Sequence, residues 1–341
     1  MPAMMTRREA IRLTAAAGAA AIASASDVDA AASQPATKVN FKVPSDACDC
    51  HTHVFGDPRA FPFAPGRTYT PERASVAEMR ALHRALKLDR VVIVQPSVYG
   101  SDNSCTIDAV RSLGEARARG VGVIDETTVS ESMLDVMDRG GIRGVRLNLE
   151  TFGQTDPETA RARLLATVAR VKPRGWHVQI YARLSVIEAV GDEIRASPVP
   201  IVVDHFGGAR ASLGVEQPGF QTLVGLVQSG KAYVKISGAY RTAGPVREPL
   251  APGAGPDYAD VAPLARALVA ANPQRIVWGT DWPHPDSSQV PGRAATDVTP
   301  LLQIDDGHLL NQLPLWLPDA AIRRQILVDN PARLYGFGGR G

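Results

Sequence analysis

The sequence is poor in cysteine, has no excess of one charge, and contains no uncharged apolar run long enough to cross a bilayer. Three cysteines in 341 residues are too few for a disulfide framework. The 37 basic and 35 acidic side chains give a formal net charge of +2, so the chain lacks the basic footprint of a nucleic-acid-binding protein. We therefore expect no nucleic-acid partner and no membrane insertion, and a homo-oligomer remains open.

The composition is that of one large folded domain. Hydrophobic residues make up 45% of the chain and charged residues 21%, which supplies a sizeable core and argues against wholesale disorder. The length suits a single α/β barrel, because such barrels often fold as one unit.

Residues 1–32 have the pattern of an export signal. Arg7 and Arg8 precede an alanine-rich apolar segment, Leu13–Ala25, and small residues follow at Ala30–Ala32. This order resembles a twin-arginine signal, which would carry the folded protein to the periplasm. The alternative is an N-terminal extension on a cytoplasmic enzyme.

Short β-branched segments alternate with longer amphipathic ones from residue 46 onward, after an expected linker at residues 33–45. The expected strands are Asp46–Cys50, Arg90–Gln95, Gly120–Ile124, Gly141–Asn148, His177–Tyr181, Pro200–His205, Ala232–Ser237 and Arg275–Asp281. The expected helices are Ser75–Leu86, Ser130–Arg139, Pro157–Val171, Ile187–Arg195, Pro263–Ala271 and Asp319–Val328. Eight such units predict a single (β/α)₈ TIM barrel over residues 46–341. A doubly wound sheet is the alternative, although the glycine-rich fingerprint that often follows its first strand is absent.

Polar residues gather at the carboxyl ends of three expected strands. His51 and His53 end the first strand, His205 ends the sixth and Asp281 ends the eighth. Residues two apart on a strand point to the same face, and the strand ends of a barrel surround one mouth. A lone His-x-His pair is often structural and a lone aspartate often caps a turn, but the combination predicts a shared site. His284, between Pro283 and Pro285, is the residue that we expect to brace a loop.

The same segments resemble the amidohydrolase superfamily. Within it, the chain is most similar to the 2-pyrone-4,6-dicarboxylate lactonases and the 4-sulfomuconolactone hydrolases. The similar segments, between about Asp46 and Tyr335, are His51-Thr52-His53, Val203-Asp204-His205, Trp278-Gly279-Thr280-Asp281-Trp282-Pro283-His284, Phe61-Pro62-Phe63-Ala64-Pro65, Tyr69-Thr70-Pro71, Gly144-Val145-Arg146, Gly175-Trp176-His177-Val178 and Asp329-Asn330-Pro331.

The resemblance bears on metal content. Many members of the superfamily hold one or two divalent metals on the His-x-His pair, an anionic residue of the fourth strand, further histidines and the last-strand aspartate. Here Arg146 stands in place of the bridging anion and Tyr181 in place of a histidine, which disfavours a two-metal site. The similar lactonases imply catalysis without a metal, which we favour. A single Zn²⁺ is the alternative, and its ligands would be His51, His53, His205 and Asp281.

The resemblance also implies a reaction and a substrate class. Asp281 would act as general base on water, and His51, His53 and His205 would polarise a lactone carbonyl as fixed donors. An anionic group of the substrate would be bound by five residues, since guanidinium and hydroxyl groups suit an acid. These are Arg146, Arg241, Tyr69, Ser97 and Tyr181.

Two positions depart from the pyrone-dicarboxylate lactonases. Phe152 replaces a second arginine, and Asp286 replaces an asparagine after the strand-eight aspartate. Fewer cations argue against the same dicarboxylate bound in the same way. We therefore expect a small anionic lactone of aromatic-compound breakdown, muconolactone-like (such as 4-sulfomuconolactone) or a pyrone carboxylate. The alternatives are a sugar-acid lactonase, a metal-dependent decarboxylase of the same superfamily, and a non-catalytic binding protein.

Overall fold

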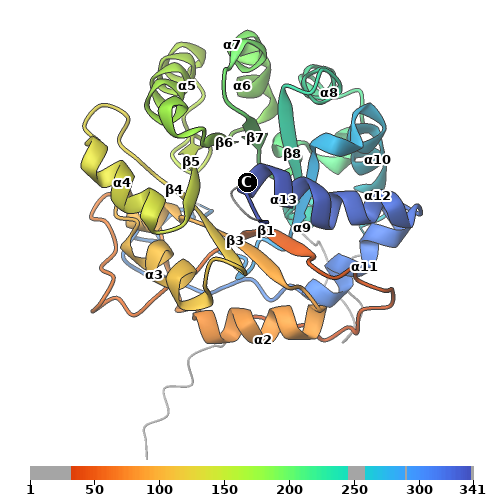
Figure 1. Cartoon of the computed structure of the whole chain (residues 1–341), viewed down its shortest axis with the longest axis horizontal. Helices are drawn as coiled ribbons and strands as arrows, with labels where there is room; N and C mark the ends of the chain where they lie inside the picture. Colours follow the sequence, from red (N-terminus) through yellow and green to blue (C-terminus); the bar gives the residue numbers. More distant parts are fainter. Residues whose placement is uncertain (1–31, 245–257, 289, 339–341) are drawn as a thin grey trace, which may run out of the picture. The chain divides into compact units, whose positions relative to one another are not determined.

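The computed structural model describes residues 32–244, 258–288 and 290–338. Its centre is a sheet of eight parallel strands in the order β1-β3-β4-β5-β6-β7-β8-β9, and the helices surround it (Figure 1). The strands are β1 (Cys48–Thr52), β3 (Arg90–Val94), β4 (Ala118–Gly122), β5 (Ile142–Asn148), β6 (His177–Tyr181), β7 (Ile201–Val203), β8 (Ala232–Ser237) and β9 (Ile276–Gly279). The predicted (β/α)₈ barrel is confirmed.

The barrel closes between its first and last strands. Asp281 N donates to His51 O at 2.8 Å, and His53 N donates to Trp282 O at 2.7 Å. The buried carboxylate of Asp49 joins the same two segments, because it accepts hydrogen bonds from Thr280 N at 3.0 Å and Thr280 Oγ1 at 2.6 Å. Closure therefore sets the first and last strands side by side at the point where both expected catalytic motifs begin.

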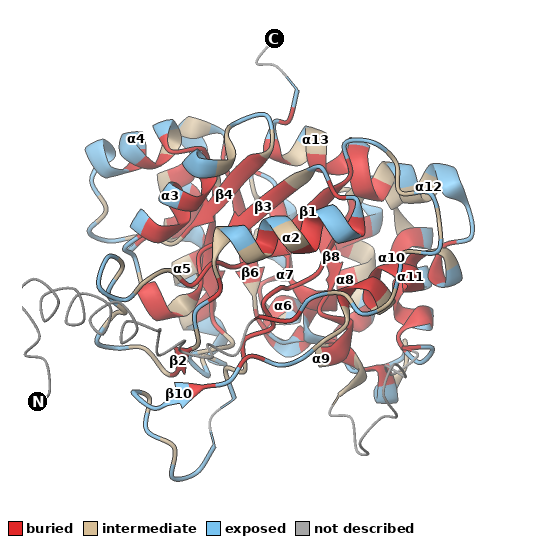
Figure 2. Ribbon diagram, turned by 90° about the horizontal axis from the view of Figure 1, so that it is seen from below, coloured by how far each residue is buried: buried red, intermediate tan, exposed pale blue. Residues whose placement is uncertain are grey.

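The described helices are α2 (Val76–Leu86), α3 (Ser104–Leu113), α4 (Glu131–Arg139), α5 (Pro157–Val171), α6 (Leu184–Ala189), α7 (Gly191–Ala196), α8 (Phe220–Gln228), α9 (Ala239–Ala243), α10 (Ala262–Ala271), α11 (Asp306–Trp316), α12 (Ala320–Arg324) and α13 (Asn330–Tyr335). In α2, Ser75 and Glu78 form a capping box, and Met79, Leu82 and Leu86 face the core. Helices bury one face against the strands and expose the other (Figure 2). No helix among the described residues is long and apolar enough to span a membrane.

Several predicted boundaries were wrong. The predicted helix Ile187–Arg195 is two short helices, α6 and α7, and β4 lies two residues earlier than expected. Helices α3 and α8 were not predicted, and α11 occupies part of the connection expected to be irregular. Pro314 lies inside α11 near its end, where a proline removes a hydrogen bond of the last turn only.

The segment expected as a linker packs against the barrel. The Asp305 carboxylate accepts hydrogen bonds from Thr37 N at 3.0 Å and from Ala36 N at 3.1 Å, and Ser33 O accepts one from Trp282 Nε1 at 3.0 Å. The segment contains no helix or strand up to Pro44. Residues 1–31, which hold nearly all of the expected export signal, lie outside the described residues.

Candidate active site

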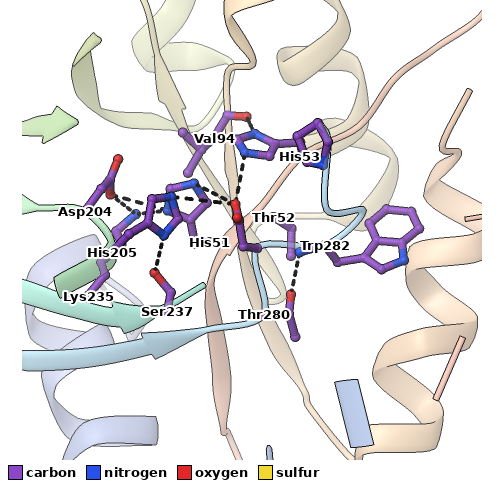
Figure 3. A network of polar contacts seen from close by, with 12 residues as sticks. His51, Thr52, His53, Val94, Asp204, His205, Lys235, Ser237, Thr280 and Trp282 are labelled. Atoms are coloured by element: carbon purple, nitrogen blue, oxygen red, sulfur yellow. Dashed lines mark hydrogen bonds and ion pairs between the residues drawn. The ribbon is translucent and has the colours of Figure 1, made fainter. Parts of the chain in front are cut away.

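The four residues predicted to carry the chemistry meet in the mouth of the barrel. Asp281 Oδ1 lies 3.6 Å from His51 Nε2, 3.5 Å from His53 Nε2 and 3.7 Å from His205 Nε2. All four side chains are buried. Figure 3 shows the three imidazoles gathered around one point. The predicted spatial convergence of two strand-borne histidine groups and one carboxylate is present.

A register shift in β1 turns His51 inward. Cys48 and Cys50 pack in the apolar cluster inside the barrel, whereas Asp49 faces Thr280 and helix α2. Strict alternation would place His51 on the same side as Asp49. Because the pairing of β1 with β3 shifts between Asp49 and Thr52, His51 instead lies inside, beside Lys235.

Asp281 and His205 hold backbone conformations that are uncommon outside glycine. Their φ angles are 69° and 46°. Such conformations cost on the order of 1–3 kcal/mol and collect at functional sites. Gly238, with φ 61°, leaves the necessary room, since a Cβ there would lie 2.9 Å from His205 Nδ1. The chain therefore tolerates local strain where it aims the two side chains at each other.

Two neighbours hold the second oxygen of Asp281. Arg241 Nε donates to Oδ2 at 2.7 Å, and the Tyr240 hydroxyl donates to it at 2.6 Å. Oδ1 accepts no hydrogen bond from any described residue. Burial alone would raise the pKa of Asp281, but Arg241, aided by His205, holds that pKa well below its ordinary value. The carboxylate is therefore ionised, and Oδ1 faces the three imidazoles.

A cluster of buried polar side chains lies on the Nδ1 side of the His51 ring. Asp204 Oδ2 accepts hydrogen bonds from Arg146 Nε at 3.0 Å and from Gln179 Nε2 at 2.9 Å. Lys235 Nζ donates to Gln179 Oε1 at 2.7 Å and lies 3.6 Å from Asp204 Oδ1. Lys235 is 0% exposed, which is rare for a lysine without ionic partners.

The other ring nitrogens show which hydrogen bonds the imidazoles can make in the cavity. His53 Nδ1 lies 2.8 Å from Val94 O, and a carbonyl only accepts, so His53 carries a proton on Nδ1. In a singly protonated His53, Nε2 therefore has no proton, and His53 donates in the cavity only when both ring nitrogens are protonated. His205 Nδ1 lies 2.9 Å from Ser237 Oγ, which can donate or accept. Burial lowers the pKa of His205 to about 4.

The five residues expected to bind substrate line one cavity beside the histidines. The cavity volume is about 20 Å³, or about 310 Å³ when the adjoining open solvent space is included. Its wall includes Tyr69, Ser97, Arg146, Tyr181 and Arg241. Arg146 lies over the ring of Tyr181 at 4.7 Å, and its terminal nitrogens have no hydrogen-bond partner among the described residues. Burial raises the pKa of Tyr69 to about 12, so its hydroxyl stays protonated.

Arg241 has a position that the sequence did not indicate. Its Nε pairs with Asp281, and its Nη2 donates to Pro285 O at 3.0 Å. Most of the guanidinium is therefore engaged with the protein, and its salt bridge holds the expected catalytic carboxylate.

The two departures from the lactonase pattern lie at the edge of the site. Phe152 is 50% exposed and is not among the residues that line the cavity. Asp286 lies between the lining residues Pro285 and Ser287, and its carboxylate pairs with Arg293 at 3.4 Å. His284 braces the loop as expected, since its Nε2 lies 3.0 Å from Asp306 Oδ2.

The donor set fits one metal ion of the zinc type. His51, His53 and Asp281 form one group whose ligand atoms lie within 4.8 Å of one another. His205 Nε2 lies 3.7 Å from Asp281, so three imidazoles and one carboxylate match the ligand types and the number that Zn²⁺ prefers. His51 Nε2 and Asp281 Oδ1 are buried and have no hydrogen-bond partner among the described residues. Opposing this fit, Lys235, Arg146 and Arg241 already place three cations against the two carboxylates Asp204 and Asp281.

Sequence reasoning missed three residues of the site. Tyr240, Lys235 and Gln179 contact the predicted residues directly or through Asp204. The signal for two of them was the period-two alternation of a strand, which puts Gln179 on the face of Tyr181 and Lys235 on the face of Ser237. Tyr240 lies in the short helix after β8 and carried no such signal.

Comparison with known proteins agrees with this geometry. A 2-pyrone-4,6-dicarboxylate hydrolase of Comamonas testosteroni is 36% identical over 301 residues, which cover 88% of this chain and 93% of that protein. A 4-sulfomuconolactone hydrolase of Rhizobium radiobacter is 34% identical over 304 residues, covering 87% and 92%. A crystal structure of an Agrobacterium tumefaciens protein, 28% identical, superposes with a TM-score of 0.71 over 89% of this chain and 98% of that one.

The match to a family extends over most of the barrel. Residues 48–337 fit the amidohydrolase pattern, a range that includes every residue of the site described above. The chain therefore belongs to the amidohydrolase family.

Proposed function

We propose that this protein is a hydrolase that opens a small anionic lactone. The observation that carries the proposal is the placement of Asp281 Oδ1 within 3.5–3.7 Å of three imidazole nitrogens, beside a cavity whose wall includes Arg146. A base, polarising groups and a cation in one cavity are what ester hydrolysis of an acid-bearing ring requires. Lactone hydrolases among the similar proteins support the same reaction class.

In the proposed reaction, a water held by Asp281 Oδ1 and His53 Nε2 attacks the lactone carbonyl carbon. Asp281 takes one proton from that water, and the carbonyl electrons move onto oxygen. His51 and His205 stabilise this oxyanion. When the carbonyl re-forms, the ring carbon–oxygen bond breaks, and the leaving oxygen receives the proton from Asp281. The product is one open-chain acid, and no redox partner is needed.

Arg146, Tyr69, Ser97 and Tyr181 bind the acid group of the substrate in this proposal. The free terminal nitrogens of Arg146 suit a carboxylate or sulfonate, and the three hydroxyls add donors. With Arg241 committed to Asp281 and no arginine at Phe152, the cavity serves one anionic group better than two. We therefore favour a muconolactone-like substrate over a pyrone carboxylate, within the breakdown of aromatic compounds. Unsubstituted muconolactone has one carboxylate, whereas 4-sulfomuconolactone has a carboxylate and a sulfonate and so tests whether the cavity accepts a second anion.

We propose that catalysis needs no metal, because the cations of Lys235, Arg146 and Arg241 already surround the site. If a Zn²⁺ is held, its ligands are His51, His53, His205 and Asp281, and it would act as a Lewis acid toward a carbonyl. Metal analysis of the purified protein tests this point. A stoichiometric metal whose removal abolishes turnover would refute the metal-free proposal.

The decisive assay compares 4-sulfomuconolactone, an unsubstituted muconolactone, 2-pyrone-4,6-dicarboxylate and a sugar-acid lactone side by side. We expect the highest kcat/KM for a lactone with one strongly anionic group. No ring opening of any of the four would reject the lactonase assignment, and carbon dioxide release from an aromatic acid would indicate a decarboxylase instead.

We also propose that the protein works in the periplasm after removal of residues 1–32. The twin-arginine-like segment carries this proposal. N-terminal sequencing of the native protein from fractionated cells is the test, and an intact Met1 in the cytoplasmic fraction would exclude it.

A further inference from the structure

We propose that Lys235 is a positioning residue that keeps the proton of neutral His51 on Nε2, so that His51 donates a hydrogen bond in the cavity rather than binding a metal. The use of that donor on an oxyanion rests on the proposed lactonase function, but the location of the proton does not. The reaction proposed above gives Lys235 no task, although burying a lysine completely is costly unless its charge is compensated.

The surroundings of Lys235 are those of an ammonium group. Three acceptors surround its Nζ: Gln179 Oε1 at 2.7 Å, His51 Nδ1 at 3.3 Å and Asp204 Oδ1 at 3.6 Å. An ammonium has three N–H donors and no acceptor. His51 Nδ1 therefore accepts from Lys235, and a neutral imidazole that accepts at Nδ1 carries its proton on Nε2.

The other end of the ring favours the same proton position. His51 Nε2 lies 3.6 Å from the ionised Oδ1 of Asp281. An N–H pointed at a carboxylate is attracted to it, so with a donor facing Nδ1 and a carboxylate facing Nε2 both ends of the ring favour the same tautomer. Because Nδ1 accepts from Lys235, the ring carries one proton only, on Nε2.

Asp204 competes with Lys235 for the same nitrogen. Its Oδ1 also lies 3.3 Å from His51 Nδ1. A carboxylate only accepts, so pairing with Asp204 would draw the proton to Nδ1 and turn the Nε2 lone pair toward the cavity. Asp204 Oδ1 accepts no hydrogen bond from any residue that the structure describes, whereas the contact of Lys235 with His51 has hydrogen-bond geometry. Lys235 therefore favours the tautomer of His51 with its proton on Nε2, and Asp204 favours the tautomer with its proton on Nδ1.

His51, in β1, and His53, just after it, then have opposite roles. Val94 O fixes the His53 proton on Nδ1 and leaves a lone pair at Nε2. Lys235 fixes the His51 proton on Nε2. Zn²⁺ coordinates only a deprotonated ring nitrogen, and it usually relies on an acceptor behind the ring, as His53 has. His51 has a donor, Lys235, facing Nδ1, so its Nε2 keeps a proton and cannot bind Zn²⁺ as one of the four ligands.

Long-range ¹H–¹⁵N NMR on wild-type protein labelled in its histidine rings tests the proton position directly. We expect a protonated, pyrrole-type Nε2 and an unprotonated, pyridine-type Nδ1 for His51, and the reverse for His53. His51→Gln identifies the signals. A pyridine-type Nε2 of His51 in the wild-type protein overturns the inference without any need for a folded variant at Lys235.

Zinc binding by metal-stripped protein, measured by equilibrium dialysis, tests the consequence. Lys235→Met should move the His51 proton to Nδ1 and strengthen Zn²⁺ binding by about 10- to 100-fold, the usual effect of a residue behind a metal ligand. Lys231→Met, an exposed lysine at the start of the same strand, should change neither measurement. Arg146→Met removes a buried cation that does not contact His51, so an equal gain in zinc affinity there would mean that charge alone is responsible and would overturn the inference.

These outcomes are separable from those of the proposed function. A protein that opens none of the lactones but shows the expected His51 tautomer disproves the lactonase and leaves the role of Lys235 intact. A protein that opens lactones but carries the His51 proton on Nδ1 does the opposite.

Discussion

Arg241 Nε lies 2.7 Å from Asp281 Oδ2, and this ion pair leaves Oδ1 as the oxygen that faces the imidazoles. Tyr240 donates to the same Oδ2. The expected base is therefore ionised, oriented by two donors, and free at one oxygen only. Both donors lie in α9, the helix after β8, whereas Asp281 itself lies in the turn after β9.

Asp281→Asn should lower kcat by about 10²–10⁴-fold, because an amide cannot take the proton of the attacking water. The amide oxygen can still accept a hydrogen bond from Tyr240, so we expect a folded protein with an unchanged circular dichroism spectrum. Steady-state kinetics on the preferred lactone is the measurement. Asp192→Asn, an exposed carboxylate on α7, is the matched control and should leave kcat unchanged. Near-complete activity of the Asp281 variant would remove Asp281 from the role of base.

Arg241→Met should move the acid limb of the kcat/KM profile to higher pH. In the wild-type protein, burial raises the pKa of Asp281, and Arg241 more than offsets this, so the base stays ionised below its ordinary range. Removing the guanidinium leaves burial as the larger influence, and the carboxylate then protonates at a higher pH. The pH dependence of kcat/KM between pH 4 and 8 measures the shift. An acid limb in the same place would show that Arg241 does not set the ionisation of the base.

The residues that sequence reasoning identified are those whose placement follows from strand polarity alone. Parallel strands of a barrel all end at the same mouth, so His51, His205 and Asp281 could be brought together without knowing any side-chain contact. Lys235 and Gln179 lie deeper, and their roles depend on which side chains face each other across the barrel interior. Lys235 meets His51 across 184 positions of sequence. That contact also requires the register shift of β1, which no local pattern indicated.

Helix prediction failed for a different reason. Helix α3 presents small or polar side chains on its buried face, including Cys105, Thr106 and Ala109, so its apolar stripe is weak in the sequence. Its start lies close to β4 because a glycine leaves room: a Cβ at Gly122 would lie 2.8 Å from Oδ1 of Asn103, the residue before α3. Packing against β4 therefore stabilises α3, and the sequence of the helix alone does not show this packing.

His177→Met should reduce the pH dependence of stability. Burial lowers the pKa of His177 to about 3, and neither of its ring nitrogens has a hydrogen-bond partner among the described residues. Because the folded pKa lies below the unfolded value of about 6.5, the stabilisation is complete above pH 6.5 and is lost as pH falls toward 3. Each such histidine contributes a slope of about 1.4 kcal/mol per pH unit in that window.

Urea unfolding at pH 7, 6 and 5 measures this slope for wild type and variant. We expect the variant to lose one histidine's share, while His51 and His205, whose pKa values are also lowered, keep the remainder. Tyr335→Phe alters the ring that packs against His177 at 5.3 Å without adding or removing a group that titrates in this range, so its slope should match wild type. An unchanged slope in His177→Met would contradict the burial of a neutral ring.

Asp305→Asn should loosen the segment at residues 33–45. The carboxylate accepts from Ala36 N, Thr37 N and Thr37 Oγ1, and it also caps α11. Hydrogen bonds to a charged group are worth roughly 1.5–3 kcal/mol each, and an amide keeps only part of them. We expect faster proteolysis within residues 33–45 and a lower free energy of unfolding. Asp319 caps α12 and makes no hydrogen bond to the segment. Asp319→Asn should therefore lower the free energy of unfolding without exposing residues 33–45 to protease.

The double variant Phe152→Arg with Asp286→Asn should shift substrate preference toward 2-pyrone-4,6-dicarboxylate. Phe152 is half exposed in the turn after β5, so a longer cationic side chain can be accommodated there without disturbing the core. Asp286→Asn removes a negative charge from the rim of the cavity and releases Arg293 from its partner. One added charge-assisted pair is worth roughly 1.5–3 kcal/mol, which corresponds to about a 10- to 100-fold gain in relative kcat/KM for the second carboxylate. The kcat/KM ratio between the dicarboxylate and a singly charged lactone is the readout, and Phe152→Met with Asp286→Asn separates the new cation from the lost acid. If wild type already prefers the dicarboxylate, or the ratio does not rise in the arginine variant, then these two positions do not govern the charge that the cavity accepts.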